Sequence, residues 1–299
     1  MKNYIISFAL IVILISCSQD DVCIRTENTL PSSSALVNEL SNFNDSLFLT
    51  KPHTRVSRKK IMDGMSIVVA DAIGAYGVGR IGLKVGAFFG QPHVGAAIGA
   101  LIGGAYSSYE CYNTLNSTRA CLSSVQRKPI EVAAAYVPAL ETESLVQENL
   151  PHKISLNYSD ENNYNIEFGA KHNIIVSNLQ ANNFVLDSKV KQYLSADEFR
   201  ILNSDEFIAG YDSIVNKVSE CAIKGEIPES ADNDVSALLM NLFATVLDTY
   251  SNNVDDIEFI INKYIDAVQR TEELSNEEKE NIYQALSVAA SSYELWNLK

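Results

Sequence analysis

Two runs of regularly spaced glycines, GLKVGAFFG at residues 82–90 and GAAIGALIG at residues 95–103, decide the fold of this 299-residue chain. The glycines recur every fourth residue, so on a helix they share one face. A face without side chains lets a second helix backbone approach closely, which is the small-xxx-small packing device. The runs therefore predict two helices packed through a seam of glycines: Gly79, Gly82, Gly86, Gly90, Gly95, Gly99 and Gly103.

Between the two runs stands Gly90-Gln91-Pro92-His93, which is typical of a helix stop followed by a turn. Proline lacks an N–H group and disfavours helical geometry in the residue before it. We therefore predict a helical hairpin over residues 61–122. Bulk in the seam should force the arms apart, so we expect Gly86→Leu to be severe. We expect Gly86→Ala to be milder, because alanine is the better helix former.

The charges on the first arm bear on whether the hairpin spans a membrane. Arg80 and Lys84 lie opposite the glycines, and Asp71 adds a third charge. Each costs about 2.5–3.5 kcal/mol near the centre of a bilayer. The charge-free stretch of the second arm, residues 94–109, covers only about 24 Å of the roughly 30 Å of hydrocarbon. We expect the hairpin to pack inside the protein's own fold, with membrane insertion as the alternative.

Residues 1–17, MKNYIISFALIVILISC, have the pattern of an export signal, with Lys2 before an apolar run too short to remain as a membrane span. The end of this run, Leu14-Ile15-Ser16-Cys17, resembles a bacterial lipobox, which implies cleavage after residue 16 and lipidation of Cys17. Ser18-Gln19-Asp20-Asp21 resembles the acidic export tag of surface lipoproteins in the Bacteroidetes. We expect an outer-membrane lipoprotein on the cell surface. A periplasm-facing lipoprotein and an ordinary secreted protein are the alternatives.

Export makes disulfides accessible to the remaining cysteines, which are Cys23, Cys111, Cys121 and Cys221. On one unbroken helix Cys111 and Cys121 would lie about 15 Å apart, beyond the limit of about 7 Å between bridged Cα atoms. They can pair only if residues 113–119 form a loop, which the sequence NTLNSTR permits. A Cys111–Cys121 disulfide and unpaired buried thiols are both open.

The rest of the chain predicts a mainly α fold, in which irregular segments join the glycine-rich hairpin to a C-terminal antiparallel helical bundle. Residues 17–60 form a polar linker with a short helix over 36–49, and residues 123–166 an irregular linker. Residues 167–299 form an acidic helical domain, with Asp234 and Ser275 in capping positions. In this region Phe168-Gly169-Ala170-Lys171-His172-Asn173 looks like a turn that enters a helix.

The charge distribution excludes nucleic acid as a partner. Residues 193–299 carry 21 acidic and 7 basic side chains, so the whole net charge of -14 arises there. Such a surface repels a phosphate backbone. A solvated acidic helical face is the plain explanation.

Motifs for chemistry are scarce in the sequence. Residues 77–82 match Gly-x-Gly-x-x-Gly, but the acidic residue that a dinucleotide site needs about 20 positions later does not follow, so we expect no cofactor. The scattered histidines predict no metal site. His172 and Asn173 are the weak candidates for function. A capping or core-satisfying role is favoured for His172, and a hydrolase site around it is the alternative.

The lipobox, the paired glycine runs, ADAIGAYG at residues 70–77 and the later Gly-x-x-His-Asn ending at Asn173 together resemble a family of uncharacterised Bacteroidetes lipoproteins. This resemblance implies no known activity. The hairpin alone is similar to glycine-zipper domains of Gram-negative outer-membrane lipoproteins, but departs from them at Asp71, Arg80 and Lys84.

We therefore expect a non-enzymatic, lipid-anchored protein with a structural or interaction role in the cell envelope. Its partners would be the membrane, reached through the N-terminal lipid, and an envelope protein or a second copy bound through the hairpin. The alternative is a membrane-active protein, toxin-like or pore-forming, that acts through the glycine-zipper hairpin.

Overall fold

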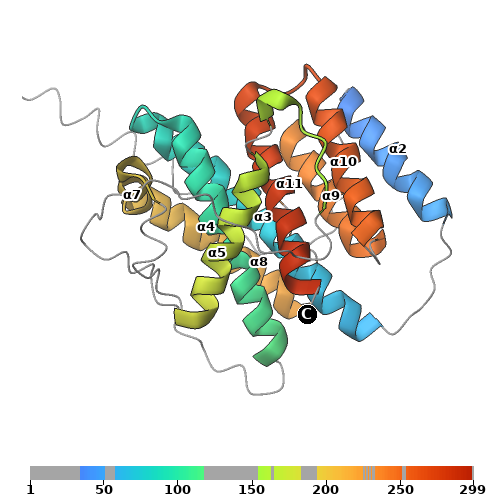
Figure 1. Ribbon diagram of the computed structural model, residues 1–299, viewed down its shortest axis with the longest axis horizontal. Helices are drawn as coiled ribbons and strands as arrows, with labels where there is room; N and C mark the ends of the chain where they lie inside the picture. Colours follow the sequence, from blue (N-terminus) through green and yellow to red (C-terminus); the bar gives the residue numbers. More distant parts are fainter. Residues whose placement is uncertain are drawn as a thin grey trace, which may run out of the picture. The chain divides into compact units, whose positions relative to one another are not determined.

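The computed structural model describes residues 34–50, 58–117, 154–162, 165–182, 194–224, 226, 228, 230, 233–250 and 254–297. In these residues every regular element is helical, which confirms the predicted mainly α fold (Figure 1). The elements are α2 (Ala35–Thr50), α3 (Arg58–Phe88), α4 (Pro92–Ser117), the 3-10 turn η1 (Asp160–Asn162), α5 (Asn165–Asn182), α7 (Ala196–Leu202), α8 (Asp205–Lys224), α9 (Val235–Tyr250), α10 (Val254–Arg270) and α11 (Asn276–Asn297).

The long helices α3 and α4 form a hairpin around which the other helices pack. α11 lies against both arms, α5 lies against α4 and α11, α7 lies mainly on α4, α8 touches both arms, and α9 covers α3 (Figure 1). The segments that the sequence assigns to a hairpin domain and a C-terminal domain therefore belong to one compact unit, Ser34–Lys299. This happens because the apolar surface of α3 extends beyond its glycine face and must also be covered.

The turn of the hairpin is a Schellman motif. Gly90 has a positive φ of 74°, the left-handed geometry that glycine adopts without strain. The N–H of Gln91 donates to the carbonyl of Gly86 at 2.7 Å, and the N–H of Gly90 to that of Ala87 at 3.0 Å. Gly90 thus ends α3, and Pro92 opens α4, where its missing N–H is harmless.

Three helix starts carry side-chain caps, two of them at predicted positions. Ser275 and Glu278 exchange backbone-to-side-chain hydrogen bonds of 2.8 and 3.2 Å at the start of α11, a complete capping box. Ser195 and Glu198 do the same at α7. At α9 the Asp234 carboxylate accepts from the N–H of Ala237 at 2.9 Å. These caps confirm the helix starts predicted at Asp234 and Ser275.

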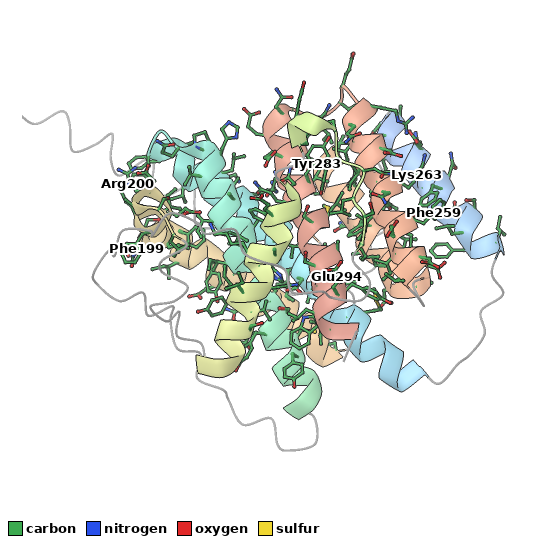
Figure 2. All side chains as sticks on the ribbon, in the orientation of Figure 1. Phe199, Arg200, Phe259, Lys263, Tyr283 and Glu294 are labelled. Atoms are coloured by element: carbon green, nitrogen blue, oxygen red, sulfur yellow. The ribbon has the colours of Figure 1, made fainter. Side chains whose placement is uncertain are left out.

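Helix α2 belongs to the folded body, although the sequence places it in a polar linker. It packs on α9 and α10, with Leu40 fully buried. Lys263 on α10 donates to Glu39 at 2.8 Å, and the rings of Phe43 and Phe259 lie 5.6 Å apart; Figure 2 shows the two α10 side chains on the flank nearest α2. These contacts bury the apolar side of α2, so α2 is part of the folded protein and not an isolated helix in a linker.

Residues 154–159 lie across α10 and α11 without forming a strand pair. Their backbone N–H groups bond to side chains instead: Ile154 donates to Glu294 at 2.6 Å and Asn157 to Asn262 at 2.8 Å. Figure 2 shows Glu294 on α11, one of the helices beneath this segment. Residues 154–159 thus have no regular secondary structure of their own.

One local prediction is wrong, and one of two open alternatives is disfavoured. Gly169 does not lie in a turn but inside α5, where a Cβ would come within 2.7 Å of the Ser287 carbonyl; glycine is needed here for a close helix approach. Helix α4 continues to Ser117, so residues 113–117 do not form the loop that a Cys111–Cys121 disulfide requires. Cys111 is buried, and Cys121 lies outside the described residues.

The cap of α9 gives a pH-dependent prediction. Partial burial opposes ionisation of Asp234, but hydrogen bonds from Ala237, Ser236 and Arg80 outweigh it, so its pKa lies below the ordinary 3.8. Because the folded pKa is depressed, the stabilisation is present above 3.8 and is lost as the pH falls through the folded value. Asp234→Asn keeps a good cap but loses the ion pair. We expect wild type to melt higher than this variant near pH 7 and the difference to shrink in acid, as measured by thermal melts. A constant difference would contradict the linkage.

Candidate functional site

The two arms of the hairpin meet backbone to backbone at Gly82 and Gly95. A Cβ on Gly82 would lie 1.9 Å from the carbonyl oxygen of Gly95, and a Cβ on Gly95 would lie 2.0 Å from that of Gly82. Gly86 is equally confined, with its Cβ position 2.4 Å from the Gln91 oxygen and 2.9 Å from the Cα of Gly95. At this end of the hairpin only glycine fits on both helices.

The seam continues toward the other end of the hairpin. A Cβ on Gly99 would lie 2.4 Å from the carbonyl oxygen of Val78, and one on Gly103 would lie 2.4 Å from that of Gly74. Gly74 was not predicted as a seam residue. The signal was present, because Gly74 lies eight residues before Gly82 and so shares its face, but Val78 interrupts the row of glycines.

Gly79 borders the seam, because a Cβ on Gly99 would lie 3.1 Å from its Cα, but it also faces a third helix; Gly90 lies outside the seam. The Cβ position of Gly79 is 3.4 Å from the Cβ of Ala100 on α4 but only 2.0 Å from Asn281 Oδ1 on α11. Asn281 passes over Gly79 and donates to the backbone carbonyl of Tyr76 at 3.0 Å. Gly90 has nothing within 4 Å and serves the turn alone. Gly79 therefore gives α11 close access to α3, and Gly90 ends α3.

A buried polar network lies beside the seam and includes both weak candidates for function. His172 of α5 and Asp71 of α3 are each 0% exposed, and His172 Nε2 lies 3.3 Å from Asp71 Oδ1. The hydroxyl of Ser292 on α11 donates to the other carboxylate oxygen. The network thus connects α3, α5 and α11, although its members are far apart in the sequence.

Asn173 fixes the other side of the imidazole ring. Its Oδ1 lies 3.2 Å from His172 Nδ1, and its Nδ2 donates to the Ser291 carbonyl at 2.9 Å. Both ring nitrogens therefore face side-chain oxygens, so the ring is held from both sides. Nucleophilic catalysis needs a ring nitrogen that faces a hydroxyl or thiol. The geometry fits the structural role favoured for His172.

The cations of α3 lie in two different environments. Arg80 pairs with Asp234 at 2.7 Å and donates to the Tyr76 hydroxyl at 3.0 Å, so it connects α3 to the start of α9. Lys84 is exposed. The side of α3 opposite the glycines is thus partly covered by other helices and partly open to water near the turn.

Known proteins and metal chemistry offer no further assignment. In the part of the chain that the structure describes, no three His, Cys, Asp or Glu side chains gather as a metal site would need. Cys17, the predicted lipidation site, lies outside that part. No protein-family model, curated protein or solved structure matches the chain.

Proposed function

We propose that this is a lipid-anchored protein of the outer membrane, held at the cell surface through Cys17, with a structural or interaction role in the cell envelope. The observation that carries the proposal is the burial of the hairpin. The stretch Met65–Phe88 is long and apolar enough to cross a membrane, yet 72% of its most apolar window is buried inside the protein. Because protein already covers the hairpin, we propose that the N-terminal lipid attaches the chain to the membrane.

The partner we propose is another envelope protein. Each glycine face is occupied by the other arm of the same hairpin, so a second copy could bind there only if the seam opened. The acidic surface of residues 193–299 remains available to a basic partner surface. The resemblance to Bacteroidetes lipoproteins agrees with this location and adds no activity.

A second candidate function is a membrane-active protein that releases the hairpin into a bilayer. Its support is again the apolar length of Met65–Phe88, together with Phe88, which is 85% exposed beside the turn. Release would break the buried Asp71–His172 contact and the Arg80–Asp234 pair, which both hold α3 in the bundle. This candidate therefore needs a trigger that offsets the free energy lost with these contacts.

One substitution separates the two candidates. In cells, Cys17→Ala is expected to abolish incorporation of labelled palmitate and to move the protein from the membrane fraction to the soluble fraction. Ser18→Ala, the neighbouring change, should leave both unchanged. Continued palmitate labelling of Cys17→Ala would show that Cys17 is not the lipid site. Loss of the label with full membrane retention would favour the hairpin as the membrane element.

A further inference from the structure

Residues 154–159, which we call the strap, lie across α10 and α11 with alternating burial. Ile154, Leu156 and Tyr158 are buried or partly buried, whereas the residue after each of them is exposed. The three inward side chains pack on the apolar core. Side chains that point alternately to two sides are typical of an extended backbone. The strap therefore lies on the two helices as an extended peptide lies on its binding surface.

Helix α10 holds the strap at its backbone. Glu258 accepts from the N–H of Ser155 at 3.0 Å, and Asn262 accepts from the N–H of Asn157 at 2.8 Å. The Asn262 amide also donates to the carbonyl of Ser155 at 2.7 Å. Gln269 donates to the carbonyl of Asn157 at 3.1 Å. Every peptide has such backbone groups, so these contacts do not depend on the side chains of the strap.

Helix α11 contacts the two ends of the strap. The Glu294 carboxylate accepts from the N–H of Ile154 at 2.6 Å. At the other end, the hydroxyl of Tyr158 donates to the carbonyl of Tyr283 at 2.8 Å and lies 2.6 Å from the Ser287 hydroxyl. The strap thus runs toward the C-terminal end of α10 and toward the N-terminal end of α11.

The contacting positions share one spacing on the two helices. They are 258, 262 and 269 on α10 and 283, 287 and 294 on α11, so each set forms a single row on its helix. Two residues of an extended chain cover about 6.6 Å, close to the rise of about 5.4 Å in one helical turn. A row of side chains on a helix therefore matches the repeat of an extended peptide. We call these two rows the strap site.

The helices that carry the strap site are held by other parts of the protein. α10 packs on α2, α9 and α11, and α11 packs on both hairpin arms. The four hydrogen bonds between the strap backbone and α10 are exposed, so bonds to water offset much of their loss when the strap leaves. Ile154 is the one strap side chain that is fully buried. A competing segment therefore has few buried contacts to replace.

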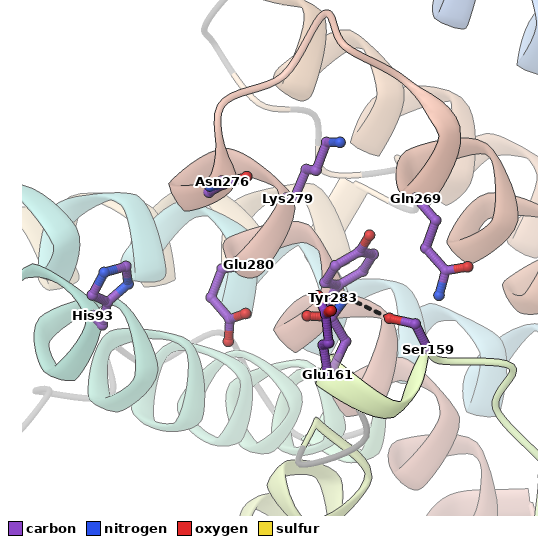
Figure 3. Close-up of a pocket in the computed structure, with 9 residues that line it drawn as sticks. His93, Ser159, Glu161, Gln269, Asn276, Lys279, Glu280 and Tyr283 are labelled. Carbon is purple, nitrogen blue, oxygen red and sulfur yellow. Dashed lines mark hydrogen bonds between the residues drawn. The ribbon is translucent and has the colours of Figure 1, made fainter.

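The two ends of the strap site define the chemistry of such a segment. The carboxylates of Glu258 and Glu294 both accept N–H groups where the strap begins, and they favour a positive charge nearby. In the sequence, Lys153 directly precedes the strap. At the other end, Ser159 and Tyr283 border a cavity of about 580 Å³, which gives a longer segment room to continue (Figure 3).

We propose that the strap site binds an extended segment of another envelope protein, in which a basic residue precedes apolar side chains at alternate positions. The strap occupies the site until this segment displaces it. The inference rests on the interaction role proposed above and names the kind of partner. A second copy fits the site less well, because residues 160–164 tie its strap to α5, which packs on its own α4 and α11.

A fluorescent peptide with the sequence of residues 153–160, KISLNYSD, tests the proposal by anisotropy with the purified full-length protein in mild detergent. The opened variant, Ile154→Ser with Tyr158→Ser, loses two inward side chains of the strap. It should bind the peptide at least about tenfold more tightly than wild type, whose own strap competes for the site. No binding to the opened variant, or equal affinity for wild type, would overturn the proposal.

Two altered peptides test the chemistry of the segment. One has the same composition but places the Ile, Leu and Tyr residues in succession, and the other has Glu in place of the first Lys. Each should bind the opened variant about tenfold more weakly than KISLNYSD. Equal affinity for the reordered peptide would contradict recognition of alternate side chains, and equal affinity for the Glu peptide would contradict the role of the two carboxylates.

Substitutions on the protein locate the bound peptide. In the opened variant, Asn262→Leu should weaken binding about tenfold or more, because it removes one donor and one acceptor for the peptide backbone. Asn38→Leu, the same change at an exposed position of α2, should leave it unchanged. Unchanged affinity in Asn262→Leu, or an equal loss in Asn38→Leu, would place the peptide elsewhere and overturn the proposal.

Two further measurements keep the test decisive. If the opened variant does not fold, Asn157→Pro opens the strap by removing a single N–H and leaves the inward side chains in place. A mixture of wild type and opened variant should stay monomeric in gel filtration, and a heterodimer would assign the site to a second copy instead. The palmitate experiment on Cys17 is independent of peptide binding, so the anchor and the strap site can fail separately.

Discussion

A Gly82→Ala protein is expected to melt well below the native protein, although the change adds a single methyl group. The new Cβ would lie 1.9 Å from the Gly95 carbonyl oxygen, which is backbone and cannot rotate away. The helices would have to separate along a seam that is closed on both sides. Overpacking of this kind costs about 1–3 kcal/mol, or about 2–12 °C in melting temperature for a domain of this size.

Gly77→Ala is the matched control, because it makes the same change in the same helix on another side. There the Cβ would lie 3.1 Å from Ile214 Cγ2, the end of a side chain that can shift. Alanine also gains about 1 kcal/mol of helix propensity over glycine. Circular-dichroism melts should therefore place Gly77→Ala near or above wild type. Equal melting temperatures for the two variants would mean that the seam is not closed in solution.

The same geometry changes the expectation for Gly86. From the sequence, Gly86→Ala is expected to be mild, because only helix propensity and one methyl group are considered. The structure puts that methyl 2.4 Å from the Gln91 carbonyl oxygen in the turn. This oxygen also accepts the N–H of Gly95 at 3.0 Å, so moving it disturbs the start of α4. We now expect alanine at Gly86 to be destabilising as well.

His172→Leu is expected to cost about 1–3 kcal/mol of unfolding free energy, because it removes one hydrogen-bond partner of the buried Asp71 carboxylate. Leucine fills similar space but leaves Asp71 buried, with Ser292 as its remaining side-chain donor among the described residues. Chemical denaturation monitored by circular dichroism measures the loss. His93→Leu, at an exposed position near the turn, should be close to neutral.

The double variant Asp71→Leu with His172→Leu distinguishes a pairwise effect from simple loss of packing. If His172→Leu is harmful because Asp71 loses its partner, removing both should recover part of the loss relative to the sum of the two single changes. Strictly additive costs would show that the two side chains do not interact. A His172→Leu protein as stable as His93→Leu would show that the polar network does not stabilise the fold.

The sequence predicts the helices well because their signals are local. The capping box at Ser275 and the apolar stripe of α10 each lie within a few turns and need no distant partner to be recognised. The glycine spacing likewise predicts a close contact. It could not reveal that Gly79 faces α11, since that depends on Asn281, two hundred residues later.

The polar features could not be predicted because the fold assembles them from separate segments. Asp71 meets His172 only after α3 and α5 have packed, and neither neighbourhood in the sequence indicates the other. Gly169 was misread for a similar reason, since glycine before a polar pair is typical of a turn and its partner Ser291 lies on α11.

The contacts of α11 also set the order in which the chain can fold. Asn281 bonds to Tyr76 across 205 residues, and Glu273, just before α11, accepts from the N–H of Leu36 across 237 residues. Contacts of such long sequence separation form late. Until the C-terminal helices have been synthesised, the face of α3 that they cover remains open to solvent. An apolar helix that stays uncovered for that interval is prone to aggregate.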